Sequence, residues 1–363
     1  MLESPIQQLN KRLQNPKQHR RFSLLYIGNQ LSEHGYTATM VETLGELLAE
    51  HYEVFRASSK RLPLLRLVDM LFTLFKLRKR IGIVIIDTYS SKAFYYAWAV
   101  ALLARLLGKP YIPILHGGDL PRRLQRHPVL CRSIFAFSQV NVAPSEYLCR
   151  AFIEAGFQNT ELIPNYINIS LYPFLLRPSV RPRLLWVRSF HQTYHPEMAL
   201  KVLALLLPKY PDACLCMVGP DKDGSLERCK LLAAELGIED KVEFTGLLDK
   251  SAWVRLSVQY DIFINTTNFD NTPVSVIEAM ALGLPVVSTN AGGLPYLLTH
   301  RHDALLTPIG QEKDFATAIE YLINNADFAQ VLAQNARQKV ASFDWTVLQK
   351  RWYKLIEQTS FLS

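Results

Sequence analysis

The stretch IFINTTNFDNTPVSVIEAMALGLPVVS, residues 262–288, decides the fold of this protein. It begins and ends with short apolar runs, residues 262–265 and 285–288, which have the length and composition of buried strands. Between them a polar loop leads into an apolar segment of helical length, residues 274–281, which Gly283 is expected to end. A strand, a helix and a second strand in this order predict a parallel βαβ unit, because a helical crossover returns the chain to the same edge of the sheet.

The start of this helix is expected to bind an anion. Thr272 fits the N-cap position and Pro273 fits the first helical position, so the first-turn amides would point beyond the carboxyl end of the strand. Glu278 lies among apolar helix residues, where an unpaired carboxylate is costly, and it therefore needs hydroxyl or amide partners. Asp270 in the loop could reach a second group of the same ligand. A buried glutamate bonded to backbone and an ordinary turn aspartate fit the spacing equally well.

The same alternation of apolar strands and helix-length segments runs along the whole chain. The expected strands are residues 22–27, 82–87, 111–115 and 140–143 in the first half, and 184–187, 214–218, 242–245, 262–265 and 285–288 in the second. Helix-length segments separate them, for example residues 90–107, 196–207 and 226–236. This order favours parallel sheets that are covered by helices on both faces, and therefore an α/β fold.

A length of 363 residues suits two domains better than one. Residues 173–182 are rich in proline and arginine and precede a fresh strand, so we place the boundary there. We expect a flexible polar tail at 1–20, one domain at 21–176, a second at 183–342 and a C-terminal helix at 343–363 that packs back toward the first domain. Two doubly wound, Rossmann-like domains would then face a cleft lined by the carboxyl ends of both sheets.

Composition favours a cytoplasmic globular protein. Hydrophobic residues make up 49% of the chain and charged residues 20%. The longest apolar run, residues 93–104, is too short to span a bilayer, and the first thirty residues lack the order of a signal peptide. The five cysteines show no CxxC spacing, which argues against a metal site or disulfide framework.

Positive charge is concentrated in the first part of the chain. Residues 1–160 contain 21 Lys and Arg against 11 Asp and Glu, and the densest block is residues 59–80. Its seven cations are Lys60, Arg61, Arg66, Lys76, Arg78, Lys79 and Arg80. A basic amphipathic segment is typical of a protein that binds an anionic membrane surface or partner. The alternative is a solvated helix whose apolar side packs on its own domain. Nucleic acid is not expected, because no binding motif accompanies the charge.

The stretch after Asp270 closely resembles the donor-binding signature of the retaining GT-B glycosyltransferases of family 4, the glycosyl transferases group 1. Glu278-Ala279-Met280-Ala281, Gly283, Pro285-Val286-Val287 and Gly292-Gly293-Leu294-Pro295 match that signature position by position. The resemblance implies a GT-B fold, with acceptor binding by the first domain and donor binding by the second. It also implies transfer of a sugar from a nucleotide-sugar to a glycan or lipid-linked acceptor, without a metal or other cofactor.

The resemblance assigns four residues to the reaction centre. Glu278 matches the glutamate that bonds the ribose, and Asp270 takes the place of a glutamate that contacts the donor sugar. Arg188, just after the strand at 184–187, matches the arginine that binds the diphosphate, which suits its planar fork of donors. His116 begins a His-Gly element after the strand at 111–115, and its histidine is expected to approach the sugar and phosphate.

Further residues are assigned to donor and acceptor contacts. The donor set is Asn271, Thr272, Pro273, His195, Gly117, Gly246 and Leu247, and the acceptor-side pair is Gly28 and Asn29. His195 lies near the position where many relatives carry a second cation, a lysine, and Tyr296 occupies a position that is commonly glutamate. These departures, together with Asp270, motivate one rival hypothesis, a catalytically weak nucleotide-sugar-binding or partner subunit. A GT-B-fold sugar-nucleotide epimerase would use the same architecture and is a second rival, although the family signature argues against it.

Asp221 and Asp223 have the DxD spacing with which glycosyltransferases of another fold hold a metal. Here they follow the strand at 214–218 and precede a helix, where aspartate is an ordinary turn residue. We therefore expect no metal site. The chain also lacks GxGxxG and GxxxxGK(S/T), which argues against dehydrogenase and kinase functions.

Overall fold

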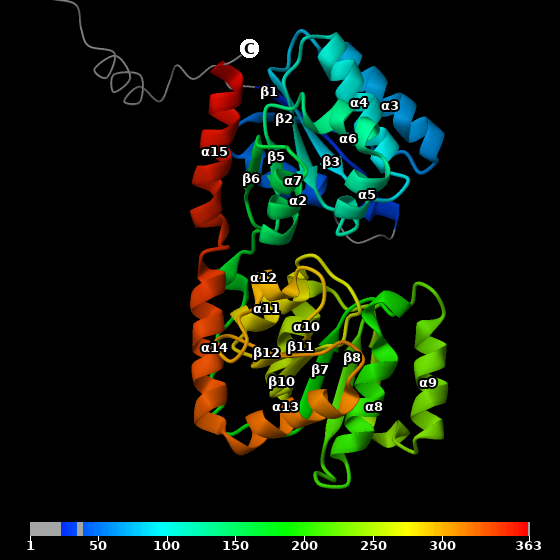
Figure 1. The fold of residues 1–363 in the computed structure, drawn as a ribbon, viewed down its shortest axis with the longest axis vertical. Helices are drawn as coiled ribbons and strands as arrows, with labels where there is room; N and C mark the ends of the chain where they lie inside the picture. The colour runs from blue at the N-terminus through cyan, green and yellow to red at the C-terminus, as the bar shows by residue number, and fades with distance from the viewer. Residues whose placement is uncertain (1–22, 35–38, 362–363) are drawn as a thin grey trace, which may run out of the picture. The chain divides into compact units, whose positions relative to one another are not determined.

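The computed structural model describes residues 23–34 and 39–361, so the tail expected at 1–20 lies outside the described residues. The chain divides into two compact units (Figure 1). Unit 1 contains the residues up to Gly117, Arg122–Val142 and the residues from Leu355 onward, and unit 2 contains Gly118–Pro121 and Ala143–Lys354. The last helix, α15 (Trp345–Phe361), contributes residues to both units.

The first sheet has six strands in the order β2-β1-β3-β4-β5-β6. Its strands are β1 (Ser23–Ile27), β2 (Glu53–Ala57), β3 (Ile83–Thr88), β4 (Tyr111–Leu115), β5 (Asn141–Ala143) and β6 (Thr160–Leu162). The helices between them are α2 (Met40–Ala49), α3 (Pro63–Leu77), α4 (Phe94–Leu106), α5 (Leu120–Arg126), α6 (Pro128–Phe135) and α7 (Glu146–Glu154). The central strands β3 and β4 are buried along their whole length, as expected of parallel strands covered on both faces.

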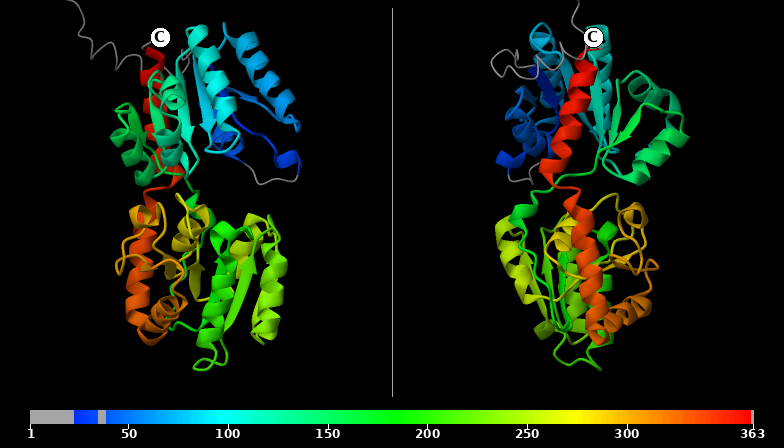
Figure 2. Two further views of the ribbon diagram at one scale, coloured as in Figure 1. Left: turned by 45° about the vertical axis from the view of Figure 1, so that its right-hand side comes forward. Right: turned by 90° about the vertical axis from the view of Figure 1, so that its left-hand side faces the viewer.

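The second sheet also has six strands, in the order β12-β11-β10-β7-β8-β9, and its pairs are parallel. Its strands are β7 (Arg183–Val187), β8 (Cys214–Val218), β9 (Val242–Gly246), β10 (Ile262–Asn265), β11 (Val286–Thr289) and β12 (Leu305–Thr307). Its helices are α8 (Pro196–Leu206), α9 (Ser225–Glu235), α10 (Lys250–Leu256), α11 (Val274–Ala281), α12 (Leu294–Leu297), α13 (Glu312–Asn324) and α14 (Ala326–Ala341). Figure 2 shows helices on both faces of each sheet, which confirms the predicted doubly wound α/β class.

The predicted βαβ unit is present as β10, α11 and β11, and α11 spans the predicted residues 274–281, but the roles of the two residues before it differ from the prediction. Pro273 is the N-cap, with an extended ψ of 118°, and the first helical residue is Val274. No side chain caps the helix, so the predictions of Thr272 as N-cap and Pro273 as first helical residue are wrong. Proline disfavours a helical conformation in the residue before it and fixes only its own φ, so an extended ψ at Pro273 makes this residue the N-cap.

The segment predicted as a domain boundary is anchored to unit 2 by Arg177. This side chain is 6% exposed and donates hydrogen bonds of 2.8–3.2 Å to four backbone oxygens. Those oxygens belong to Leu175, Ser257, Tyr260 and Gly283. Burial lowers the pKa of Arg177 to about 10, although Asp261 at 3.5 Å opposes the shift. The more exposed Arg181 also pairs with Asp261, at 2.8 Å. The arginines of this segment therefore fix its path across the sheet.

A pair of glycines after β11 holds the loop after β10. A Cβ on Gly292 would lie 2.2 Å from the carbonyl oxygen of Asp270, and a Cβ on Gly293 would lie 2.1 Å from that of Asn271. The amide of Gly293 donates to the Asp270 oxygen at 2.8 Å. Only glycine permits this approach, so the glycine pair fixes the backbone that carries Asp270.

Replacement of Arg177 by methionine should lower the free energy of unfolding by about 3 kcal/mol or more. The change leaves buried backbone oxygens without a donor and removes one of the two arginines that pair with Asp261. Arg181→Met is the matched control, because its side chain is 54% exposed and should contribute at most about 1 kcal/mol. Urea unfolding of both variants measures the difference. Equal losses would contradict the anchoring role of Arg177.

Gly292→Ala should destabilise the protein more than Gly310→Ala. Both glycines have a positive φ, +56° and +68°, so each substitution costs about 1–2 kcal/mol in backbone conformation. A Cβ on Gly310 meets no atom within 4 Å, whereas one on Gly292 meets backbone at 2.2 Å. We expect an additional loss of about 1–3 kcal/mol for Gly292→Ala, measured by urea unfolding. If the two variants have the same urea midpoint and the same slope, the close contact at Gly292 does not contribute to stability.

Candidate functional site

Two oppositely charged residues lie where the strand order of the second sheet reverses. β7 is flanked by β10 on one side and β8 on the other, and such switch points are where ligands bind in open α/β sheets. Arg188 directly follows β7, and Asp270 lies in the loop after β10. The guanidinium Nη2 of Arg188 pairs with Oδ2 of Asp270, and both side chains are largely buried, at 17% and 12% exposed. The structure therefore brings together two of the predicted reaction-centre residues.

Hydrogen bonds between neighbouring loops hold this pair in place. The Tyr194 carbonyl accepts from Thr266 Oγ1 at 3.0 Å, and the Thr193 carbonyl accepts from the Asn268 amide at 2.8 Å. The Tyr194 ring lies 4.2 Å from the guanidinium carbon of Arg188, which places the cation over an aromatic face. The residues after β7 and those after β10 thus form one connected loop region.

Among the buried polar atoms that have no partner in the described residues, three lie in or beside the loops after β7 and β10. They are Arg188 Nε, His195 Nδ1 and Ser275 Oγ. His195 has a left-handed φ of 45° and immediately precedes α8, while Ser275 lies in the first turn of α11. Buried polar atoms are rarely left unbonded, so donors of this kind at two helix starts suit an anionic ligand. Sequence reasoning missed Ser275, although its place in the first turn was a usable signal.

Glu278 is 6% exposed on the side chain and has two polar partners. Its Oε1 accepts a hydrogen bond from the Tyr172 hydroxyl at 2.6 Å and lies 2.7 Å from Lys250 Nζ. Burial, reinforced by the negative charge of Glu278, raises the pKa of Tyr172 above its ordinary value, so the phenol stays protonated and donates. The sequence predicted hydroxyl or amide partners for Glu278 but could not identify Tyr172, which is 106 positions away in the chain.

Of the remaining predicted donor residues, all but Gly117 lie in loops at the same edge of the second sheet. Gly246 ends β9 with φ +68° and its carbonyl accepts from the Gly219 amide at 2.8 Å, while Leu247 is 63% exposed. Their loop leads into Lys250, the partner of Glu278. The backbone amide of Asn271 donates to Asp270 Oδ1 at 2.9 Å. Thr272 and Pro273 follow and lead directly into α11.

His116 belongs to a separate cluster at the carboxyl edge of the first sheet. Its Nε2 lies 2.8 Å from Oδ1 of Asp87, the same oxygen that accepts a 2.9 Å bond from the Tyr26 hydroxyl. Asp87 Oδ2 is buried without a partner among the described residues, and a Cβ on Gly28 would lie 2.5 Å from it. The predicted Gly28 therefore makes room for a carboxylate that sequence reasoning missed, although an aspartate ending an apolar strand was the available signal. Gly117 packs in the same way on Ser90, where a Cβ would lie 2.3 Å from the amide nitrogen.

Asn29 and Arg66 bond to each other, which corrects the expectation that Arg66 is an exposed cation. Arg66 is buried, and it donates to Asn29 Oδ1 at 3.0 Å and to the carbonyl oxygens of Lys60 and Arg61. The Asn29 carbonyl also accepts from Thr39 Oγ1 at 2.7 Å. Both side chains therefore stabilise the loops around α3.

Asp221 and Asp223 act as turn residues, as the sequence favoured. Asp221 Oδ1 accepts the Gly224 amide at 3.0 Å, and Asp223 Oδ1 accepts the Ser225 hydroxyl at 2.5 Å. Hydrogen bonds from Ser225 and from the Gln192 amide lower the pKa of Asp223 to about 2. In the described part of the chain, no group of three or more His, Cys, Asp or Glu residues is arranged to hold a metal ion.

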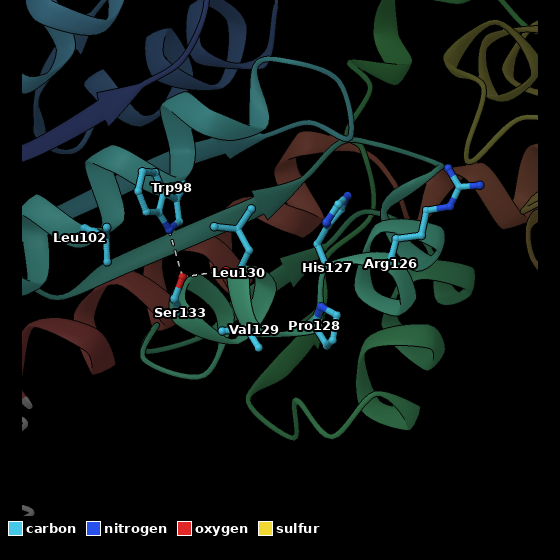
Figure 3. Close-up of a pocket in the computed structure, with 8 residues that line it drawn as sticks. All are labelled: Trp98, Leu102, Arg126, His127, Pro128, Val129, Leu130 and Ser133. Atoms are coloured by element: carbon cyan, nitrogen blue, oxygen red, sulfur yellow. Dashed lines mark hydrogen bonds between the residues drawn. The ribbon is translucent and has the colours of Figure 1, made fainter.

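An open pocket of about 540 Å³ lies elsewhere in unit 1, between α4 and the α5–α6 segment (Figure 3). Its lining is mainly apolar and includes Trp98, whose indole Nε1 donates to Ser133 Oγ at 3.1 Å. None of the predicted site residues contributes to it. We therefore place the candidate donor site at the carboxyl edge of the second sheet, with a separate cluster around His116 at that of the first sheet, and not in this pocket.

Comparison with known proteins links both halves of the chain to one enzyme group. Residues 173–339 match the family model of glycosyl transferases group 1, and residues 22–171 match that of glycosyltransferase family 4. A D-inositol 3-phosphate glycosyltransferase of Corynebacterium jeikeium is 30% identical over 168 residues, which are 45% of this chain and 40% of that relative. The amylovoran biosynthesis glycosyltransferase AmsK of Erwinia amylovora is 26% identical over 284 residues, 73% of this chain and 69% of that protein.

Solved structures share the fold over nearly the whole chain. HepE of Anabaena in complex with UDP has a TM-score of 0.74 at 18% identity and covers 93% of this chain and 100% of its own. Sucrose-phosphate synthase of Thermosynechococcus elongatus has a TM-score of 0.77 at 17% identity, with coverages of 94% and 100%. The two family matches, together with two parallel six-stranded sheets of this topology, show that the chain belongs to the group 1 glycosyltransferases and has the GT-B fold.

Proposed function

We propose that this protein is a retaining glycosyltransferase that moves a sugar from a nucleotide-sugar donor to an acceptor hydroxyl. The observation that carries the proposal is the arrangement at the carboxyl edge of the second sheet. Arg188 lies there at the topological switch point and pairs with Asp270, and Glu278 is buried on α11 with a tyrosine and a lysine as partners. HepE, a protein of similar fold, has been solved with UDP and with UDP-glucose, which supports a donor of this class.

In this proposal Arg188 binds the diphosphate of the donor. Its Nε is buried and unpartnered among the described residues, and its guanidinium is oriented by Tyr194 and Asp270. As the sugar leaves, negative charge develops on the phosphate oxygens, and a fixed cation stabilises that charge without reorganisation. The amides and Ser275 at the start of α11 would add donors of the same kind. We assign no metal to the reaction, because these groups supply the positive charge.

Asp270 would have two roles. Paired with Arg188, it orients the guanidinium and balances its charge in a largely buried setting. A diphosphate competes for the same guanidinium, and the Asp270 carboxylate would then turn to hydroxyls of the donor sugar. Aspartate is one methylene shorter than the glutamate that relatives usually carry at this position. The carboxylate of Asp270 therefore reaches less far, which restricts the donor sugars that it can contact.

Glu278 would bind the ribose. One of its oxygens already accepts from Tyr172 and contacts Lys250, so these residues hold the carboxylate while ribose hydroxyls donate to it. Lys250 is 58% exposed on the side chain and follows the loop that starts at Gly246, where it can also meet the nucleotide. The names of the curated relatives, which include an enzyme of amylovoran biosynthesis, support an acceptor from polysaccharide, lipopolysaccharide or glycolipid biosynthesis.

A catalytically weak binding subunit is the second candidate. Asp270 in ion-paired contact with Arg188, His195 at the position of a second cation and the 41% exposed Tyr296 are the features that favour it. The two candidates differ in one measurable respect, because the enzyme turns over the donor that it binds. A panel of nucleotide-sugars tested first by thermal shift and then for turnover separates them.

Glu278→Ala should weaken binding of UDP by roughly 10- to 100-fold, as expected for loss of a charged hydrogen-bond acceptor. Glu243→Ala is the matched control, since Glu243 also accepts from a tyrosine hydroxyl, that of Tyr260 at 3.2 Å, but lies in β9. Calorimetric titration of UDP, with GDP as the alternative nucleotide, measures the effect. Unchanged nucleotide affinity in Glu278→Ala would remove this residue from the site. Proton NMR of the first-formed product tests retention of the anomeric configuration.

Asp87→Asn should lower kcat by roughly 10- to 100-fold if this carboxylate positions His116, because the amide orients the imidazole less firmly. UDP affinity should stay within about twofold, since the proposed nucleotide contacts come from unit 2. Tyr26→Phe removes the other bond to the same oxygen and keeps the charge, so it is the matched control. Equal loss of kcat in both variants, together with a lower unfolding temperature, would indicate a structural role only.

A further inference from the structure

The outward face of α3 is apolar. Leu65, Val68, Phe72 and Phe75 follow one another at spacings of three and four residues, and their exposed fractions are 53%, 56%, 61% and 49%. These spacings place the four side chains on one stripe of the helix, which we call the α3 stripe. Leu64, 73% exposed, lies beside its first turn. A helix that only packs on its own domain has a polar outer face, so this arrangement needs another explanation.

The inner face of α3 already supplies the contacts with its own unit. Arg66, Met70 and Leu74 are buried, and the helix packs against α4 and strands β1 and β2. Figure 1 shows α3 beside α4 at the margin of unit 1. The α3 stripe is therefore additional apolar surface, and a contiguous exposed patch of this kind is typical of an interaction site.

Cations flank the stripe at both ends. Lys60 and Arg61 precede the helix, Lys76 lies in its last turn, Lys79 follows it, and all four are exposed. None of these four forms an ion pair with any residue in the described ranges. The one acidic residue between positions 59 and 80 is the half-buried Asp69. The stripe and these cations together form a surface that is complementary to an anionic layer with an apolar interior.

We propose that α3 docks the protein on an anionic lipid bilayer, with the α3 stripe inserted among the acyl chains and Lys60, Arg61, Lys76 and Lys79 against the head groups. A helix of 15 residues is too short to span a bilayer but can lie in its interface. In the described part of the chain, no helix combines the length and hydrophobicity needed to cross a membrane. Docking through unit 1 would bring the enzyme to acceptors held at the membrane surface.

The test is co-sedimentation of the full chain with vesicles of phosphatidylcholine that contain phosphatidylglycerol, compared with phosphatidylcholine alone. We expect binding to the anionic vesicles at low salt and its weakening as salt is added. The double variant V68S/F72S should bind at least about tenfold more weakly, because it removes inserted apolar area. Its control is L106S/V129S, since both side chains are 82% exposed in unit 1 but lie outside the α3 stripe. This control should bind as the wild type does.

Charge is tested separately from apolar area. K76E/K79E should reduce binding by roughly 25-fold or more at low salt, since each cation near an anionic surface contributes about fivefold. K313E/K350E makes the same change of net charge at two exposed lysines of unit 2 and should have little effect. These measurements need no donor or acceptor, so their failure leaves the proposed transferase function standing.

Two results would overturn the proposal. One is absence of binding to anionic vesicles at low salt, and the other is an equal loss in the α3 variants and their controls. Sedimentation equilibrium without lipid shows whether a second copy covers the stripe instead. Self-association that V68S/F72S abolishes, in a protein that does not bind vesicles, would assign the stripe to a dimer interface.

Discussion

The close contact of Gly292 and Gly293 with the backbone of Asp270 and Asn271 is the constraint on which the candidate donor site depends. Because the glycines bring two loops together without side chains between them, the loop after β10 has one path. That path carries Asp270 to Arg188 and sets the direction in which α11 begins. A side chain at Gly292 would push the loop away and would move Asp270 together with the first turn of the helix.

The parallel sheet converts this local constraint into a site. Carboxyl ends of neighbouring parallel strands lie at one edge, so Arg188 after β7 and Asp270 after β10 meet although 82 positions separate them. The buried Glu278 is stabilised by a protonated Tyr172 and by Lys250, which holds its carboxylate ready for hydroxyl donors. The cation that we propose for phosphate and the acceptor that we propose for ribose thus come from loops and one helix of the same unit.

Unit 1 combines two kinds of chemistry in one fold. Its sheet edge holds His116 through Asp87, while α3 presents an apolar stripe on the side away from its buried residues. The sequence had left open whether the basic block at 59–80 is a membrane surface or a solvated helix. The apolar outer face favours the first interpretation, and burial of Arg66 shows that one of its seven cations stabilises the fold instead.

The sequence by itself determined the α/β class, the strands Tyr111–Leu115, Cys214–Val218 and Ile262–Asn265, and the helix Val274–Ala281, because their apolar runs are continuous and bounded by clear stop signals. It did not show β2, β6 or β12, which lie at the sheet edges, where burial leaves a weaker pattern. The extended ψ of Pro273, which makes this residue the N-cap in place of Thr272, was likewise not visible. Tyr172, Lys250, Asp87 and the ion pair between Arg188 and Asp270 were decided by tertiary structure alone, since contacts between residues far apart in the chain depend on how the strands are ordered.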